Sequence, residues 1–103
     1  MAEVTIKGRD GSFKAYLALP RTTPAAGVVV AQEIFGVNQV MRDTCDWLAG
    51  AGFVAICPDL FWRIEPGIDI TDKTQAEWDR AFELFGLFDV DKGIADLQAT
   101  LAQ

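Results

Sequence analysis

The first residues whose types and spacing suit chemistry form the turn Gln32–Gly36. They follow a run of small and β-branched residues, 27–31, which is typical of a buried parallel strand. Ligands of open α/β sheets bind at the carboxyl ends of such strands. We therefore expect the Glu33 carboxylate to be partly desolvated and the backbone N–H groups of the turn to face an anion. The alternative is that Glu33 is an ordinary loop acid paired with Arg42 or Arg63.

Asp59 and the two cysteines are weaker candidates. Asp59 follows the apolar run 53–57 at the equivalent strand end, and the simpler interpretation is that it caps the turn after Pro58. Cys57 lies within that run, which favours a buried and inert thiol. Cys45 is expected to lie half-buried on a helix, where no neighbouring base would activate it.

Composition excludes several classes of function. The 103 residues include 15 acidic and 9 basic side chains, and the net charge of −6 disfavours nucleic-acid binding. The sequence contains no histidine, so it holds no complete Ser-His-Asp or Cys-His triad. Two cysteines are too few for a zinc site, phosphate-binding glycine motifs are absent, and no metal or organic cofactor is implied. No segment resembles a signal peptide or a membrane span, so a cytoplasmic location without membrane contact is expected.

Hydrophobic patterning predicts a single α/β domain over residues 1–103. Strands are expected at 3–7, 14–19, 27–31 and 53–57, the first two forming a hairpin around Asp10 and Gly11. A helix capped by Asn38 would join the last two strands in a βαβ unit. Further helices are expected over 73–86 and from Asp89 onward. Such a last helix normally leads into another strand, so the sequence looks like the beginning of a larger sheet.

Apolar residues recur at helical spacing in each of the predicted helices. They include Val40 and Trp47 in the first helix, the aromatic set Trp78, Phe82, Phe85 and Phe88, and the stripe Val90, Ile94, Leu97 and Leu101. Helical spacing favours core packing of the aromatic set over a cofactor site.

Several segments resemble the dienelactone hydrolase family. The stretch Val28–Asn38 contains the run Gln-Glu-Ile-Phe-Gly-Val-Asn, which is specific to this family. The segments Met41–Ala49, Gly52–Arg63 and Phe88–Gly93, with Asp96 and Leu97, extend the resemblance over nearly the whole chain. It implies the N-terminal half of an α/β-hydrolase fold, with three α/β/α layers and a mostly parallel sheet.

The resemblance also implies hydrolysis of small enol lactones and related carboxylic esters by a Cys, Asp and His triad. Glu33 matches the glutamate that helps to generate the nucleophilic thiolate, and the backbone N–H of Ile34 matches an oxyanion-hole donor. Gln32 and Phe35 are expected to line the pocket. Arg80 is the candidate substrate contact, because the family's carboxylate-binding arginine falls nearby, at Trp78.

The sequence has neither a G-x-[SC]-x-G nucleophile elbow nor a histidine. One hypothesis is therefore a hydrolase half that is inactive alone. The alternative is a non-catalytic, self-associating α/β module with a vestigial pocket. Because the strand 27–31 lacks one neighbour, we expect a homodimer or larger homo-oligomer, formed through this sheet edge or through an exchanged C-terminal helix.

Overall fold

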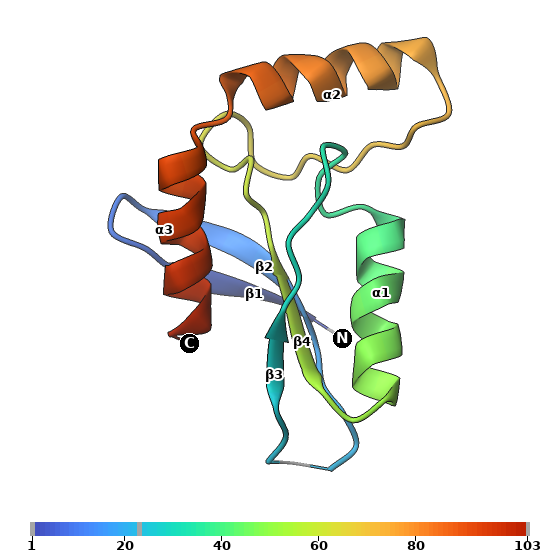
Figure 1. The fold of residues 1–103 in the computed structure, drawn as a ribbon, viewed down its shortest axis with the longest axis vertical. Coiled ribbons are helices and arrows are strands. Elements are labelled where there is room, and N and C mark those ends of the chain that lie inside the picture. The colour runs from blue at the N-terminus through green and yellow to red at the C-terminus, as the bar shows by residue number, and fades with distance from the viewer. Residues whose placement is uncertain (1, 23, 103) are drawn as a thin grey trace.

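A four-stranded mixed sheet forms the centre of the fold. The computed structural model describes residues 2–22 and 24–102 (Figure 1). Strands β1 (Ala2–Lys7), β2 (Ser12–Ala18), β4 (Val54–Pro58) and β3 (Gly27–Val29) lie side by side in that order. The pairs β1–β2 and β2–β4 are antiparallel, while β3 and β4 are parallel. The predicted hairpin and βαβ unit are both confirmed, and parallel pairing in the described residues is confined to β3 and β4.

Each helix begins at a side-chain cap. Helix α1 (Gln39–Gly50) connects β3 to β4, and α2 (Gln75–Leu87) and α3 (Val90–Leu101) follow β4. The side chains of Asn38, Thr74 and Asp89 accept backbone N–H groups of the first helical turns. The caps at Asn38 and Asp89 confirm the sequence predictions. Helix α2 begins two residues later than expected, because the hydroxyl of Thr74 supplies its cap.

The two faces of the sheet carry separate hydrophobic clusters, as strand alternation requires. On one face, Ala18, Ala55 and Cys57 pack against Met41 and Cys45 of α1. On the other face, Ile6, Phe13 and Ala15 form a cluster against which Ile56 and Ala99 of α3 pack. Helices α1 and α3 therefore cover opposite faces, which makes a three-layer α/β/α arrangement (Figure 1).

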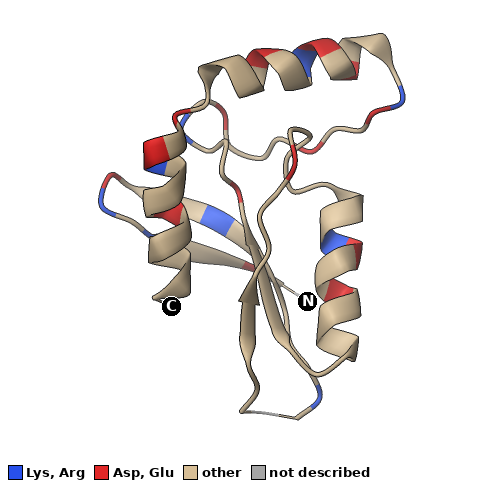
Figure 2. Ribbon diagram, in the orientation of Figure 1, with Lys and Arg blue, Asp and Glu red and all other residues tan. Residues whose placement is uncertain are grey.

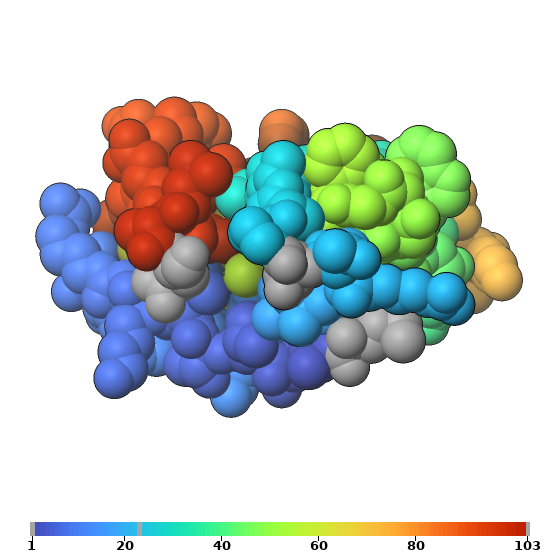
Figure 3. Space-filling model, turned by 90° about the horizontal axis from the view of Figure 1, so that it is seen from below, coloured from blue at the N-terminus to red at the C-terminus, as the bar shows by residue number. Residues whose placement is uncertain are grey.

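Strand β3 lies at one edge of this sheet, where β4 is its neighbour among the described residues. Two further bonds continue the parallel ladder, from Val54 N–H to Ala26 O at 2.9 Å and from Val30 N–H to Ile56 O at 2.8 Å. Figure 3 shows β3 (cyan) between α3 (red) and α1 (green), with its outer edge uncovered in this view. The Val-rich strand that patterning assigns to a sheet centre is thus a sheet edge in this chain.

Many apolar residues of the predicted helical stripes are exposed, including two of the aromatic set that was interpreted as core. Phe82 and Phe85 are 59% and 61% exposed, because α2 lies across the end of the sheet (Figure 1) and buries Ala81 and Leu84. Trp78 and Phe88 are half-buried. The other exposed residues of the predicted stripes are Val40, Trp47, Val90, Ile94 and Leu101. Periodicity identifies an apolar stripe, but it does not say whether another element covers that stripe.

Candidate functional site

The turn 32–36 lies at the carboxyl end of β3 and is tied to the end of β4. Gln32 accepts a hydrogen bond from the Leu60 N–H at 2.7 Å through Oε1 and donates through Nε2 to the Glu33 carbonyl at 3.0 Å. Because Gln32 is half-buried and uses both ends of its amide, it fixes the turn relative to the loop after β4. Gln32 therefore holds the turn in place, in addition to the pocket-lining role that the sequence predicts for it.

Gly36 closes the turn in a conformation that favours glycine. Its φ is +83°, and its N–H donates to the Glu33 carbonyl at 3.3 Å. A Cβ at this position would overlap the backbone carbonyl of Ile68, which crosses directly over it. The neighbouring Ile70 N–H donates to the Phe35 carbonyl at 3.0 Å, so the loop 68–70 holds the turn from above.

Gln32, Glu33 and Ile34 line one side of an apolar recess of about 150 Å³. Leu60, Phe61, Phe85 and Phe88 line its other sides. The Glu33 side chain is exposed, and no ion pair or hydrogen bond holds its carboxylate among the described residues. The Ile34 N–H likewise has no acceptor among them. Two consecutive residues therefore bring a carboxylate and an N–H without an acceptor to the lining of an apolar recess.

The other two predicted pocket residues point elsewhere. The ring of Phe35 packs edge-on against Trp78, with 5.1 Å between ring centroids, and does not line the recess. Arg80 forms ion pairs with Glu65 at 2.8 Å and with Glu83, so both carboxylates engage its guanidinium. The described chain brings Gln32, Glu33 and Ile34 together and leaves Phe35 and Arg80 outside.

The alternative pairing of Glu33 with Arg42 or Arg63 is wrong for this structure. Arg42 donates to Asp69 at 2.9 Å, and Arg63 bridges Asp10 and Asp96. The expected desolvation of Glu33 is also not found, because its side chain is exposed at the rim of the recess. The apolar run before Glu33 pairs with β4 but is only half-buried, and the chain is already exposed at Ala31.

Asp59 is a capping residue, as predicted. It is 5% exposed, and its two oxygens accept the Phe61 N–H at 3.2 Å and the Gly67 N–H at 2.8 Å. Burial raises the pKa of this carboxyl, and the two N–H bonds oppose that rise. Asp59 thereby shapes the loop 59–67, whose first residues form a wall of the recess.

The two thiols are buried and unsuited to act as nucleophiles. Cys45 and Cys57 are both fully buried between α1 and β4, so Cys45 is more deeply placed than expected. Burial raises the pKa of Cys57 to about 12 and also raises the pKa of Cys45. Thiolate formation at neutral pH is strongly disfavoured for such groups.

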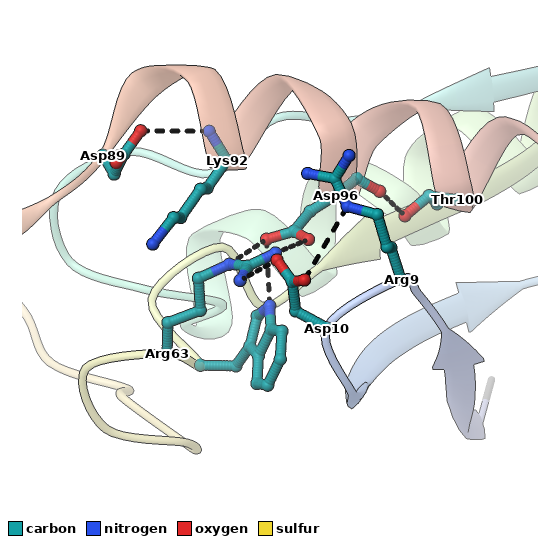
Figure 4. Close-up of polar contacts among 8 residues, drawn as sticks. Arg9, Asp10, Arg63, Asp89, Lys92, Asp96 and Thr100 are labelled. Carbon is teal, nitrogen blue, oxygen red and sulfur yellow. Dashed lines mark hydrogen bonds and ion pairs between the residues drawn. The ribbon is translucent and has the colours of Figure 1, made fainter.

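Sequence analysis missed a buried carboxylate, Asp96, on α3 (Figure 4). Asp96 is 2% exposed and accepts the Trp62 indole N–H at 2.9 Å and Arg63 Nη2 at 2.9 Å. Arg63 also donates to Asp10 at 2.7 Å and stacks over the ring of Trp62. Helix α3 also contains Asp91, Lys92 and Gln98, so nothing in its sequence distinguishes Asp96 from the other polar residues or reveals its partners.

Within residues 2–22 and 24–102, no cluster of Cys, Asp and Glu could hold a metal ion. No helix there is long and apolar enough to cross a bilayer.

The parallel unit β3–α1–β4, with a polar turn where β3 ends, is the arrangement of an α/β fold, a class in which ligands bind at the carboxyl ends of the strands. Residues 13–103 match the Dienelactone hydrolase family. A "Putative carboxymethylenebutenolidase" of Azospirillum brasilense is 62% identical over 89% of this chain and 41% of its own length. Carboxymethylenebutenolidase 1 of Cupriavidus pinatubonensis is 44% identical over 95% of this chain and 42% of its own.

A solved structure shows the same arrangement. The crystal structure of a "Putative Dienelactone Hydrolase" from Klebsiella pneumoniae superposes with a TM-score of 0.78 and 29% identity, over 98% of this chain and 41% of that one. The chain belongs to the dienelactone hydrolase family. It spans about two fifths of the length of the relatives it matches.

Proposed function

We propose that this chain supplies one half of an active site that hydrolyses ester or lactone bonds in small molecules. The observation that carries the proposal is that the exposed Glu33 carboxylate and the Ile34 N–H, which has no acceptor among the described residues, line the same apolar recess. Acyl transfer needs an N–H donor where negative charge develops on the carbonyl oxygen, and the Ile34 N–H is suited to that role. Relatives named carboxymethylenebutenolidase support this class of reaction.

Each residue then has a defined task. Glu33 helps to deprotonate the nucleophile, the Ile34 N–H stabilises the oxyanion, and Gln32 holds the turn in place. The apolar walls of the recess take the uncharged part of the substrate. A pocket role for Phe35 and a substrate contact by Arg80 stay predictions, and Arg80 would first have to leave Glu65 and Glu83.

The chain alone is expected to be inactive, because the sequence contains no histidine and both thiols are buried. The test is hydrolysis of an activated ester and of an enol lactone by the pure chain, before and after thiol alkylation. We expect background rates in both cases. Turnover that alkylation abolishes would show that Cys45 or Cys57 acts as a nucleophile and would contradict our assignment of the site.

The role of Glu33 is tested in a single polypeptide that joins this chain to the remaining part of the Azospirillum brasilense relative. We expect this chimera to hydrolyse the lactone, and Glu33→Gln to lower kcat strongly. Glu3→Gln is the matched control, because Glu3 is also exposed but lies on β1. If Glu33→Gln and Glu3→Gln had the same effect on kcat of an active chimera, Glu33 would have no role in the mechanism.

A second candidate function is a non-catalytic module that associates with itself. The uncovered edge of β3 favours it, because a free Val-rich edge is a template for strand pairing. The expected product is a homodimer joined at this edge or by an exchanged α3. Sedimentation that shows only monomer at micromolar concentration would contradict it. The cytoplasmic location stays a prediction.

A further inference from the structure

The recess beside the turn 32–36 presents mainly apolar surface. Opposite the turn, its walls are one aliphatic and three aromatic residues, Leu60, Phe61, Phe85 and Phe88. Its volume is about 150 Å³, and an apolar protein cavity of about that volume accommodates benzene. Aromatic side chains bind a further ring by stacked or edge-to-face contacts. The recess is therefore suited to an apolar group about the size of a phenyl ring.

The aromatic walls of the recess are in place without a ligand. Phe61 is 3% exposed and packs edge-on against Phe88, with 5.8 Å between the ring centroids. Phe85 is 61% exposed, because α2 buries its neighbour Leu84 instead. A substrate group that covers Phe85 removes apolar surface from water, which is the usual driving force for the binding of apolar groups.

The charges around the recess disfavour a negative group. The Glu33 carboxylate lies at its rim, and no basic side chain of the described residues lines it. Helix α2, which carries Phe85, contains three acidic residues and one basic residue, Arg80 (Figure 2). A carboxylate on the substrate would be repelled by these acidic groups and would lose its hydration against the apolar walls.

Arg80 does not offset that repulsion. Its guanidinium is paired with Glu65 at 2.8 Å and with Glu83 on the same helix. These three side chains together carry a net charge of −1 at neutral pH, so the cluster does not attract an anion. A substrate carboxylate would have to displace Glu65 or Glu83 before it could bind Arg80.

A neighbouring hollow, which shares two wall residues with the recess, contains both acidic and basic residues. Arg63 lines this hollow and is bound by Asp10 and Asp96 (Figure 4). Lys92 lines it together with Asp89, whose side chain caps α3. In this part of the described chain, the basic groups are thus matched by at least as many carboxylates.

We infer that the recess selects an uncharged apolar group of about the size of a phenyl ring. The substrate is then an ester or lactone that carries such a group without a charge on it. A positive group is disfavoured as well, because it would pair with the Glu33 carboxylate, which has to accept a proton from the nucleophile. This inference deepens the proposed hydrolase function and rests on it, since it names the class of substrate for the same site.

The first test measures binding to this chain alone, because its own residues line the recess. Three probes of nearly equal size differ in charge: phenylacetamide is neutral, phenylacetate is negative and phenethylammonium is positive. Their binding is followed by the NMR shifts of the backbone amides of Ile34 and Phe61. We expect phenylacetamide to bind at least about tenfold more tightly than either charged probe, with shifts confined to the lining of the recess.

A variant that adds a positive charge to the recess should reverse this preference. Phe85→Lys places an ammonium group on the wall at a position that is already exposed, so the fold should tolerate it. We expect it to bind phenylacetate about threefold more tightly than the unmodified chain, and phenylacetamide more weakly. Phe82→Lys is the matched control, because Phe82 is 59% exposed on the same helix but does not line the recess. Arg80→Gln is also expected to leave phenylacetate binding unchanged, and a loss would assign the substrate contact to Arg80 and overturn the inference.

The remaining outcomes separate this inference from the proposed function. The inference is overturned if a charged probe binds as tightly as phenylacetamide or more tightly, or if none of the three probes binds. Selective binding of phenylacetamide, together with a chimera that hydrolyses no ester, supports the binding preference and refutes the hydrolase role. A chimera that hydrolyses nitrophenyl phenylacetate more slowly than the same ester with a carboxylate on its acyl ring supports the hydrolase role and overturns the inference.

Discussion

Replacing Asp96 with asparagine removes one charge from the contacts that hold α3 against the sheet (Figure 4). The Asp96 side chain is 3% exposed, and its partner Arg63 is 22% exposed. Asparagine has almost the same volume and keeps one oxygen to accept the Trp62 N–H. The packing is therefore unchanged, while the partly buried guanidinium of Arg63 loses the negative charge that offsets its desolvation.

The cost follows from the burial of the pair. Removing one partner from a buried ion pair costs about 3–5 kcal/mol. Water reaches part of Arg63, which also keeps its 2.7 Å bond to Asp10, so we expect about 2–3 kcal/mol. For a chain of this size each kcal/mol lowers the melting temperature by about 4–8 °C, so Asp96→Asn is expected to lower it by about 8–24 °C.

Asp10→Asn is the matched control, because it makes the same substitution on the other partner of Arg63. Asp10 is 40% exposed, and a much smaller fall is expected for a pair in contact with solvent. Both variants are melted side by side and followed by far-UV circular dichroism. Equal falls in the two variants, or a fall below about 2 °C for Asp96→Asn, would refute the argument that burial of Asp96 sets the strength of this contact.

Three further predictions concern single residues. Burial raises the pKa of Tyr16, the one tyrosine of the sequence, to about 12, so phenolate absorbance should titrate near that pH, and a midpoint near 10 in folded protein would contradict this. A backbone N–H bond from the preceding loop lowers the pKa of Glu77 below 4.5. Its contribution to stability is present above that pH and is lost on acidification. The free energy of unfolding, measured by urea melts at several pH values, should therefore fall less steeply with decreasing pH in Glu77→Gln than in the unmodified chain. Equal slopes of the free energy against pH would refute this. Gly36→Ala should destabilise more than Gly67→Ala, which has a similar φ of +80° but open space, because only Gly36 lies under Ile68; equal melting temperatures would exclude that contact as the cause.

Elements whose structure depends on neighbours in the sequence could be predicted well. The caps at Asn38 and Asp89 follow from side chains that bond N–H groups three residues ahead, and the glycine-rich stop after α1 follows from the same local logic. The continuous apolar runs at 27–31 and 53–57 correctly indicated β3 and β4. The turn 32–36 was located for the same reason, since it lies between a recognisable strand and a recognisable cap.

Contacts between distant segments could not be predicted in this way. Arg63 meets Asp10 and Asp96, which lie 53 and 33 positions away, and nothing in the local pattern distinguishes these carboxylates from Glu33. The exposure of Phe85 and Ile94 has a related cause. Helical spacing shows that such residues share a side of a helix, but burial depends on whether a second element packs there.

The turn 32–36 is held by contacts within the described chain. Gln32 binds the Leu60 N–H, Ile70 binds the Phe35 carbonyl, and Gly36 fits beneath Ile68. An N–H donor that is oriented before substrate or partner arrives stabilises developing charge without a cost of reorganisation. Addition of the separately produced remaining part of the Azospirillum brasilense relative should therefore shift the NMR signals of the turn only slightly. Large shifts throughout 32–36 would mean that the partner builds the oxyanion site, and the chain would then supply a docking surface in place of half a preformed site.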